Sequence, residues 1–167
     1  NINQVIFGNV LQAGNGQNVA RQISVNSGIP VQVPAMTVNE VCGSGMKAVI
    51  LARQLIQLGE ADLVVAGGTE SMSRAPLLQQ YEAENATYEE PISSMVNDGL
   101  TDAFSNAHMG LTAEKVANEF SVTRTEQDQY ALNSQKKAAQ ASENGVFEAE
   151  IIPVTLPDQR IMDKDEA

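Results

Sequence analysis

The single cysteine of the chain, Cys42, is the residue best suited to covalent chemistry. It lies in the segment 39–47, NEVCGSGMK, where a short apolar run ends and a strongly helical run begins. The open N-terminus of a helix presents unpaired backbone N–H groups and a partial positive charge, which favour the thiolate, the reactive form of cysteine. Gly43 and Gly45 leave room for a substrate carbonyl to approach the backbone. These residues predict a nucleophile at a strand-to-helix turn.

Other readings of these residue types stay open. Cys42 could be a buried, inert thiol, because free cysteine behaves as a small hydrophobic residue. The single histidine, His108, could be a base that activates Cys42 or a structural residue. One Cys and one His without carboxylates at ligand spacing predict no metal site. The segment 14–19, GNGQNV, lacks the final glycine of a dinucleotide loop and the lysine of a P-loop, so we expect no nucleotide site there.

The elements that would position Cys42 follow from the apolar pattern. We expect strands at 4–10, 35–41 and 62–66, and helices at 18–26 and 46–58. Apolar residues lie nearly all round the helix at 46–58, which predicts a buried helix rather than a surface helix. The order strand, helix, strand, helix, strand predicts a doubly wound α/β fold with its ligand site outside the carboxyl ends of the strands. Cys42 follows such an end directly.

The chain becomes polar and rich in loops after residue 73, and we interpret its acidic residues there as solvated surface. Two helices are expected further on. One spans 111–120, and the other begins at a capping box formed by Thr123 and Glu126 and ends at Asn144 and Gly145. The segment 147–154 is expected to be extended.

Net charge, apolar runs and cysteine count exclude some classes of binding partner and some cellular locations. The formal net charge is −11 and the sequence pI is about 4.4, which argues against nucleic acid and anionic membranes as partners. The sequence holds no apolar run of the roughly 18 residues that a membrane span needs. One cysteine cannot form an internal disulfide framework and fits a reducing compartment, so we expect a cytoplasmic protein.

Four segments resemble the thiolase family, in the family's order and over nearly the whole chain. They are the nucleophile motif at 39–47, AGGTESMS at 66–73, DGLTDAF at 98–104 and HMG at 108–110. Within the family the chain is most similar to acetoacetyl-CoA thiolases (acetyl-CoA C-acetyltransferases), including those of bacterial mevalonate synthesis. The resemblance implies condensation of two acetyl-CoA to acetoacetyl-CoA, or the reverse thiolysis.

The resemblance also implies a fold and a division of the chain. The fold is a thiolase-like, doubly wound, layered α/β structure with an inserted loop domain. A partial N-terminal core that carries the nucleophile would span 1–71. The loop-domain excursion and the following helices would span 72–167.

Roles for single residues follow from the same resemblance. Cys42 would become acetylated, and its own amide would help to form an oxyanion hole. His108 and Met109 match positions that line the acyl and pantetheine pocket, so His108 would bind substrate rather than act as the base. Leu100 matches a position that contacts coenzyme A, although an apolar residue there could equally be packing. The coenzyme A thioester would be the substrate, and no cofactor is implied.

Thiolases also use residues that this sequence does not contain. The family's base is a histidine in the second half, and its acid-base residue for condensation is a second cysteine near the C-terminus. The chain also begins without an initiator Met. We therefore expect a fragment without turnover of its own, from a protein that forms homodimers or homotetramers.

Two alternatives remain from the sequence. One is a degradative 3-ketoacyl-CoA thiolase of broader chain length, although the pair His108 and Met109 favours short acyl groups. The other is a non-catalytic assembly or binding module, in which Cys42 would be a buried structural thiol.

Overall fold

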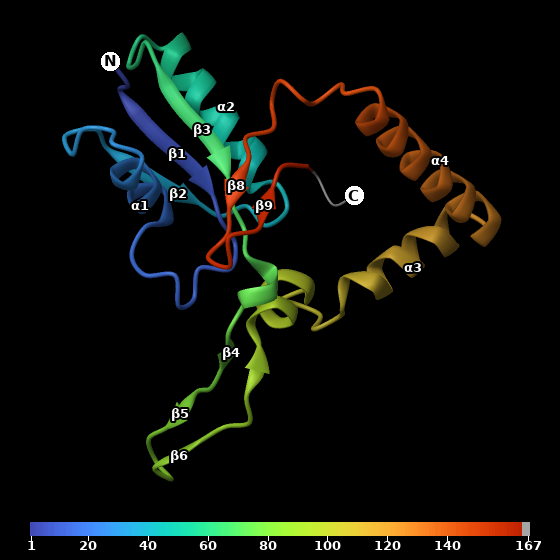
Figure 1. The fold of residues 1–167 in the computed structure, drawn as a ribbon. Helices are drawn as coiled ribbons and strands as arrows, with labels where there is room; N and C mark the ends of the chain where they lie inside the picture. The colour runs from blue at the N-terminus through green and yellow to red at the C-terminus, as the bar shows by residue number, and fades with distance from the viewer. Residues whose placement is uncertain (165–167) are drawn as a thin grey trace. The chain divides into compact units, whose positions relative to one another are not determined.

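A computed structural model describes residues 1–164 of the chain (Figure 1). The chain divides into two compact units, of which the first spans Asn1–Met109 and the second begins at Gly110. The first unit holds the parallel sheet and also the loop excursion that follows it. The domain boundary expected after residue 71 stays a prediction.

A three-stranded parallel sheet forms the centre of the first unit. Its strands are β1 (Gln4–Gly8), β2 (Ala35–Val38) and β3 (Val64–Gly68), in the order β2-β1-β3. The central strand β1 pairs with both neighbours, and its residues Val5 and Ile6 are completely buried. Apolar side chains on both faces are typical of a parallel strand that is covered on both sides.

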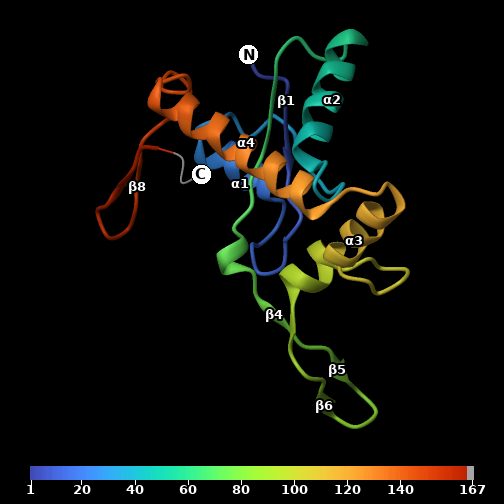
Figure 2. The ribbon, with the colours of Figure 1, turned by 90° about the vertical axis from the view of Figure 1, so that its right-hand side faces the viewer.

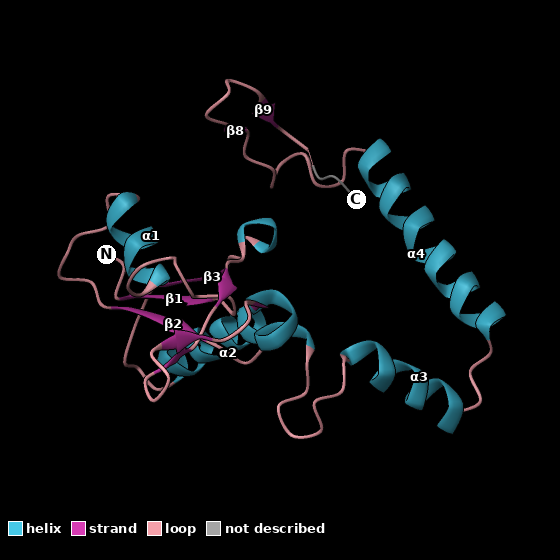
Figure 3. Ribbon diagram, turned by 90° about the horizontal axis from the view of Figure 1, so that it is seen from below, coloured by secondary structure: helices cyan, strands magenta, loops and turns pink. Residues whose placement is uncertain are grey.

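The two helices of the first unit lie on opposite faces of this sheet (Figure 3). The helix α1 (Val19–Asn26) connects β1 to β2, and α2 (Ser44–Gln57) connects β2 to β3. The connections that leave β1 and β2 therefore run over opposite faces, which confirms the doubly wound arrangement. In such sheets ligands bind beyond the carboxyl ends of the strands where the direction of winding reverses. In a sheet of the order β2-β1-β3 that point lies between the ends of β1 and β3.

The boundaries of β2 and α2 differ from the predicted ones. The strand ends at Val38, three residues before the expected end, because the Asn39 side chain accepts a 3.0 Å hydrogen bond from the Val41 N–H and forms a turn. The helix begins at Ser44 rather than at Met46. The turn that carries Cys42 is therefore longer and more tightly bonded than the sequence predicts.

The expectation of a buried helix holds for only one face of α2 in the described residues. Its buried residues are the small Ser44, Ala48 and Ala52, which form the face packed against the sheet. Large apolar residues on the rest of the helix are exposed, among them Met46 at 69% and Val49 at 56%. Apolar character all round a helix does not say which neighbour covers each side, and the sheet of the described chain covers one face.

A long excursion follows β3 within the first unit. It begins with the short 3₁₀ helix η1 (Met72–Arg74) and ends with the π-helical turn η2 (Met95–Leu100). Between them lie two short antiparallel pairs, β4 (Leu77–Leu78) with β7 (Ile92–Ser93) and β5 (Tyr81–Glu82) with β6 (Thr87–Tyr88). The hairpin of β5 and β6 extends away from the sheet in two perpendicular views (Figures 1 and 2).

The second unit holds a long helix and a hairpin. Helix α3 (Met109–Glu119) leads into it, followed by α4 (Arg124–Glu143), β8 (Val154–Thr155) and β9 (Ile161–Met162). The predicted capping box of Thr123 and Glu126 is confirmed, as is the helix stop before Gly145, which has a φ of 65°. The expected extended segment at 147–154 is wrong in its first half, because the Phe147 carbonyl accepts from the N–H groups of Glu150 and Ile151 in a turn.

Among the described residues, no helix has both the length and the apolar character to cross a membrane.

Candidate active site

Cys42 is exposed at the turn between β2 and α2. The turn closes through backbone hydrogen bonds of 3.1 Å, from Gly43 N–H to the Glu40 carbonyl and from Ser44 N–H to the Val41 carbonyl. Val41, directly before the cysteine, has a φ of 51°. A β-branched residue rarely adopts this left-handed conformation, which costs on the order of 1–3 kcal/mol and is typical of functional sites. The exposed thiol argues against the reading of Cys42 as a buried structural residue.

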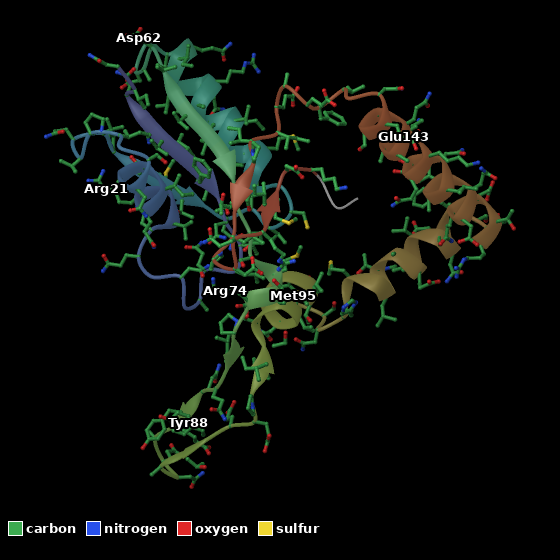
Figure 4. All side chains as sticks on the ribbon, in the orientation of Figure 1. Arg21, Asp62, Arg74, Tyr88, Met95 and Glu143 are labelled. Carbon is green, nitrogen blue, oxygen red and sulfur yellow. The ribbon has the colours of Figure 1, made fainter. Side chains whose placement is uncertain are left out.

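A pocket of about 450 Å³ lies beside Cys42 at the carboxyl ends of all three strands. Residues that end or follow β1, β2 and β3 line it, and the excursion supplies the remaining wall. The lining from the excursion and the loop after β1 is largely apolar: Val10, Leu11, Met72, Met95 and Leu100. Met95 lies at the start of η2 (Figure 4). Such a pocket suits a substrate that places a carbonyl at the sulfur and an apolar portion beside it.

Close packing between α2 and the strand ends places the helix N-terminus in this pocket. A Cβ atom at Gly8 would lie 2.4 Å from the carbonyl carbon of Ser44, and one at Gly68 would lie 3.4 Å from the Cα of Gly45. The absence of a side chain at Gly8 is therefore what lets α2 begin directly over the sheet, whereas a Cβ at Gly68 would make an ordinary van der Waals contact. This packing determines the position of the residues just before the helix, including Cys42.

The carboxylate of Glu70 joins two of the strand ends. One oxygen accepts from Asn9 Nδ2 at 2.9 Å and from the Leu11 N–H at 3.0 Å, and the other accepts from the Val10 N–H at 2.9 Å. Asn9 is 2% exposed and also donates to the Thr69 carbonyl. The loop after β1 and the loop after β3 are thus held together, and both line the pocket beside Cys42.

The structure brings one of the three predicted substrate-binding residues to this pocket. Leu100 lines it together with Cys42. Within the described residues, the lining includes neither His108 nor Met109. His108 is bridged to Thr101 on the segment that follows η2, and Met109 begins α3. The roles of His108 and Met109 in binding remain proposals.

The loop between Thr101 and His108 is stabilised by a carboxylate. The Asp102 N–H donates to the Ala107 carbonyl at 2.9 Å, and Asp102 Oδ2 accepts from both the hydroxyl and the N–H of Ser105. These hydrogen bonds, the one from the hydroxyl first, lower the pKa of Asp102 below its ordinary value. The loop that leads to His108 is thus held in a defined conformation by hydrogen bonds of its own.

Sequence reasoning did not single out Ser44, Glu70 or Asn9. Ser44 and Glu70 lie inside the motif segments, but nothing in their residue type indicates a position beside the nucleophile. One signal was available for Glu70, because it closely follows a strand end, and the carboxyl ends of parallel strands meet at one edge of a sheet. The described residues include no cluster of three or more His, Cys, Asp or Glu that could hold a metal ion.

Comparison with known proteins decides the family. The family model for the thiolase N-terminal domain matches residues 1–167. The chain belongs to the thiolase family. A relative, the probable acetyl-CoA acyltransferase of Staphylococcus aureus (strain bovine RF122 / ET3-1), is 49% identical over 99% of this chain and 44% of its own length. The corresponding Staphylococcus epidermidis protein (strain ATCC 12228 / FDA PCI 1200) is 50% identical over 95% of this chain and 41% of its own.

A solved thiolase structure agrees in fold. The Acat5 thiolase from Ascaris suum in complex with coenzyme A has a TM-score of 0.91 and 41% sequence identity, over 99% of this chain and 42% of that one. The thiolase fold expected from the sequence is therefore confirmed. The chain spans less than half the length of these relatives.

Proposed function

We propose that this chain supplies the nucleophile of a thiolase that condenses two acetyl-CoA to acetoacetyl-CoA or runs the reverse thiolysis. The observation that carries the proposal is the exposed Cys42 beside an apolar pocket, at the point where the winding of the sheet reverses. The family membership and the relatives named acetyl-CoA acyltransferase support acyl transfer. The coenzyme A bound to the Ascaris suum thiolase supports a coenzyme A thioester as the substrate.

In the proposed first step, the Cys42 sulfur attacks the carbonyl carbon of acetyl-CoA. A bond forms between this carbon and the Cys42 sulfur, and the bond to the coenzyme A sulfur breaks, so that coenzyme A leaves as a thiolate and takes up a proton. Exchange of sulfur for sulfur changes the energy little. The oxygen that becomes negative needs a donor, and the Cys42 N–H is the candidate, because the N–H groups of Gly43 and Ser44 already donate within the turn.

In the proposed second step, another acetyl-CoA loses a proton from its methyl group and its carbon attacks the acetyl group on Cys42. A carbon–carbon bond forms, and the Cys42 sulfur leaves as the thiolate. The base for this proton is not assigned to any residue of this chain. We propose instead, as the family resemblance implies, that a second cysteine elsewhere in the intact protein takes this proton, and that a histidine there activates Cys42.

The pocket residues have proposed roles in binding. Leu100 contacts the coenzyme A portion, and His108 and Met109 shape the acyl and pantetheine pocket of the intact enzyme. We further propose a cytoplasmic homodimer or homotetramer with coenzyme A thioesters as its substrates, no resident cofactor, and a place in mevalonate synthesis. A piece consisting of residues 1–167 would have no thiolysis activity, whereas the intact protein would.

A thiolase of broader chain length is the second candidate function. The name of the staphylococcal relatives favours it, since it specifies an acyl rather than an acetyl group for transfer. Steady-state rates of thiolysis by the intact protein distinguish the short-chain enzyme from the enzyme of broader chain length. A kcat/KM that falls steeply from acetoacetyl-CoA to longer 3-ketoacyl-CoA substrates supports the short-chain enzyme, and a flat or rising series supports the second candidate. No turnover of any of them contradicts both.

A further inference from the structure

The peptide that joins Val41 to Cys42 is held on one side by a single buried side chain. Ser44 is 4% exposed, and its hydroxyl donates to the Val41 carbonyl at 2.5 Å. The same hydroxyl accepts from the Glu40 N–H at 2.9 Å. A hydroxyl has one donor and a limited number of acceptor sites, so both of its capacities are used within this turn.

This carbonyl shares a rigid plane with the N–H of Cys42. A trans peptide is planar, so a hydrogen bond that fixes the direction of the Val41 carbonyl also fixes the direction of the Cys42 N–H on the other side of the bond. The turn contains no cis peptide. The Ser44 hydroxyl therefore aims the group that the proposed function uses as an oxyanion donor, and with it the Cα from which the sulfur projects.

Val41 adopts a backbone conformation that is unfavourable for a β-branched residue. Val41 has a φ of 51°, a region that β-branched residues rarely occupy. The Ser44 hydroxyl and N–H both donate to the Val41 carbonyl, while the Val41 N–H donates to Asn39 Oδ1. Three hydrogen bonds thus hold one strained residue, and Ser44 supplies two of them.

We propose that Ser44 is a positioning residue for the nucleophile, holding Val41 in its left-handed conformation so that the sulfur and N–H of Cys42 face the pocket. The effect on acyl transfer rests on the proposed function. The effect on the reactivity of the thiol does not, because alkylation of Cys42 needs neither coenzyme A nor any other catalytic residue.

The test is Ser44→Ala in the intact protein, with Ser24→Ala as the matched control. Ser24 is also a buried helical serine, at 0% exposure, but its hydroxyl has no hydrogen-bond partner among the described residues. Displacement of a reacting group by about an ångström costs roughly 100-fold in rate. We expect Ser44→Ala to lower kcat for acetoacetyl-CoA thiolysis by roughly 10- to 100-fold with little change in KM. The rate of Cys42 alkylation by iodoacetamide should fall as well, while Ser24→Ala changes neither.

A second substitution tests the mechanism itself. Asparagine tolerates the left-handed region far better than valine, so Val41→Asn should reduce the dependence on Ser44. The double variant V41N/S44A should recover much of the lost kcat and alkylation rate. If Ser44→Ala alone does not fold, the double variant should restore both the fold and the rate.

Two outcomes overturn the proposal. One is a Ser44→Ala protein that matches Ser24→Ala in kcat and in alkylation rate. The other is a double variant that is no better than Ser44→Ala in folding or in rate. An intact protein with no thiolysis activity would contradict the proposed function alone, since the alkylation rates still report whether Ser44 positions Cys42.

Discussion

The carboxylate of Glu70 accepts a 2.9 Å hydrogen bond from the side chain of Asn9, which lies 61 residues earlier in the chain. The same carboxylate also accepts from the N–H groups of Val10 and Leu11. These bonds hold the loop after β1 against the loop after β3 beside the pocket of Cys42. A charged acceptor makes each bond stronger than one between neutral groups.

Replacing this carboxylate should loosen the pocket. In Glu70→Gln one oxygen becomes an NH₂ group, so a donor of the loop after β1 faces another donor. Because Glu70 is exposed to water, we expect the free energy of unfolding of the intact protein, measured with urea, to fall by only about 1–2 kcal/mol. Glu84→Gln, in the exposed hairpin region of the excursion, is the matched control and should have no effect. Equal stability of the two variants would contradict the role given to Glu70.

The start of α2 requires a residue without a side chain at the end of β1. In Gly8→Ala the new Cβ would lie 2.4 Å from the backbone of Ser44, and backbone cannot rotate away. We expect a loss of about 3 kcal/mol in the free energy of unfolding, at the upper end of the range for overpacking.

Gly45→Ala is the control for stability, since a Cβ there meets nothing within 4 Å and alanine favours a helix. It should leave the protein as stable or slightly more stable. A Gly8→Ala protein as stable as Gly45→Ala would show that α2 does not pack on β1 in the way described.

Met109 provides a test of chain-length selectivity. If its side chain crowds longer acyl groups, Met109→Ala in the intact enzyme should raise kcat/KM for longer 3-ketoacyl-CoA substrates relative to acetoacetyl-CoA. One methylene group more or less in a hydrophobic pocket changes such ratios by roughly 10- to 200-fold. Leu111→Ala, two positions along the same helix, should not change the ratio. Unchanged selectivity in Met109→Ala would contradict the proposed role of this residue.

The capping box of α4 should make this helix sensitive to acid. Hydrogen bonds from the Thr123 N–H, and then from its hydroxyl, hold the pKa of Glu126 below its ordinary value of 4.5. A lowered pKa in the folded state means that the stabilisation is present above about pH 4.5 and is lost as the pH falls through the folded-state pKa. Helix content by circular dichroism should therefore melt at a lower temperature at about pH 3 than at about pH 7.

Substitution of the cap separates this effect from general acid unfolding. Thr123→Ala should lower the free energy of unfolding by about 1 kcal/mol near neutral pH. It should also reduce the difference in melting temperature between the two pH values. Thr125→Ala, in the first turn of the same helix, should leave this difference in melting temperature unchanged. If Thr123→Ala and Thr125→Ala respond alike, the acid sensitivity arises elsewhere.

Much of the fold followed from local pattern. The apolar runs of β1 and β3, the helix stop at Gly145 and the capping box at Thr123 depend on neighbouring residues, which a sequence displays directly. The exposure of α2 could not be predicted, because apolar side chains such as Met46 and Val49 do not reveal what packs against them.

The candidate site could be located from the sequence, but its geometry could not be predicted. A lone cysteine followed by two glycines near a strand end suggested a nucleophile, and the structure places Leu100 in the pocket beside it. The roles of both residues stay predictions. The left-handed conformation of Val41 runs against its residue preference, so no propensity predicts it. The hydrogen bonds of Glu70 and Ser44 join groups that only the folded chain brings together, so residue type alone could not indicate them.

Trapping of the acyl-enzyme tests the central claim most directly. The intact protein is incubated with acetyl-CoA labelled in the acetyl group, denatured in acid, digested and examined by mass spectrometry, with Cys42→Ser as the control. We expect the acetyl group on the peptide that contains Cys42 and its release when coenzyme A is added before denaturation. An unlabelled Cys42 in a protein that still turns over acetoacetyl-CoA would contradict the account.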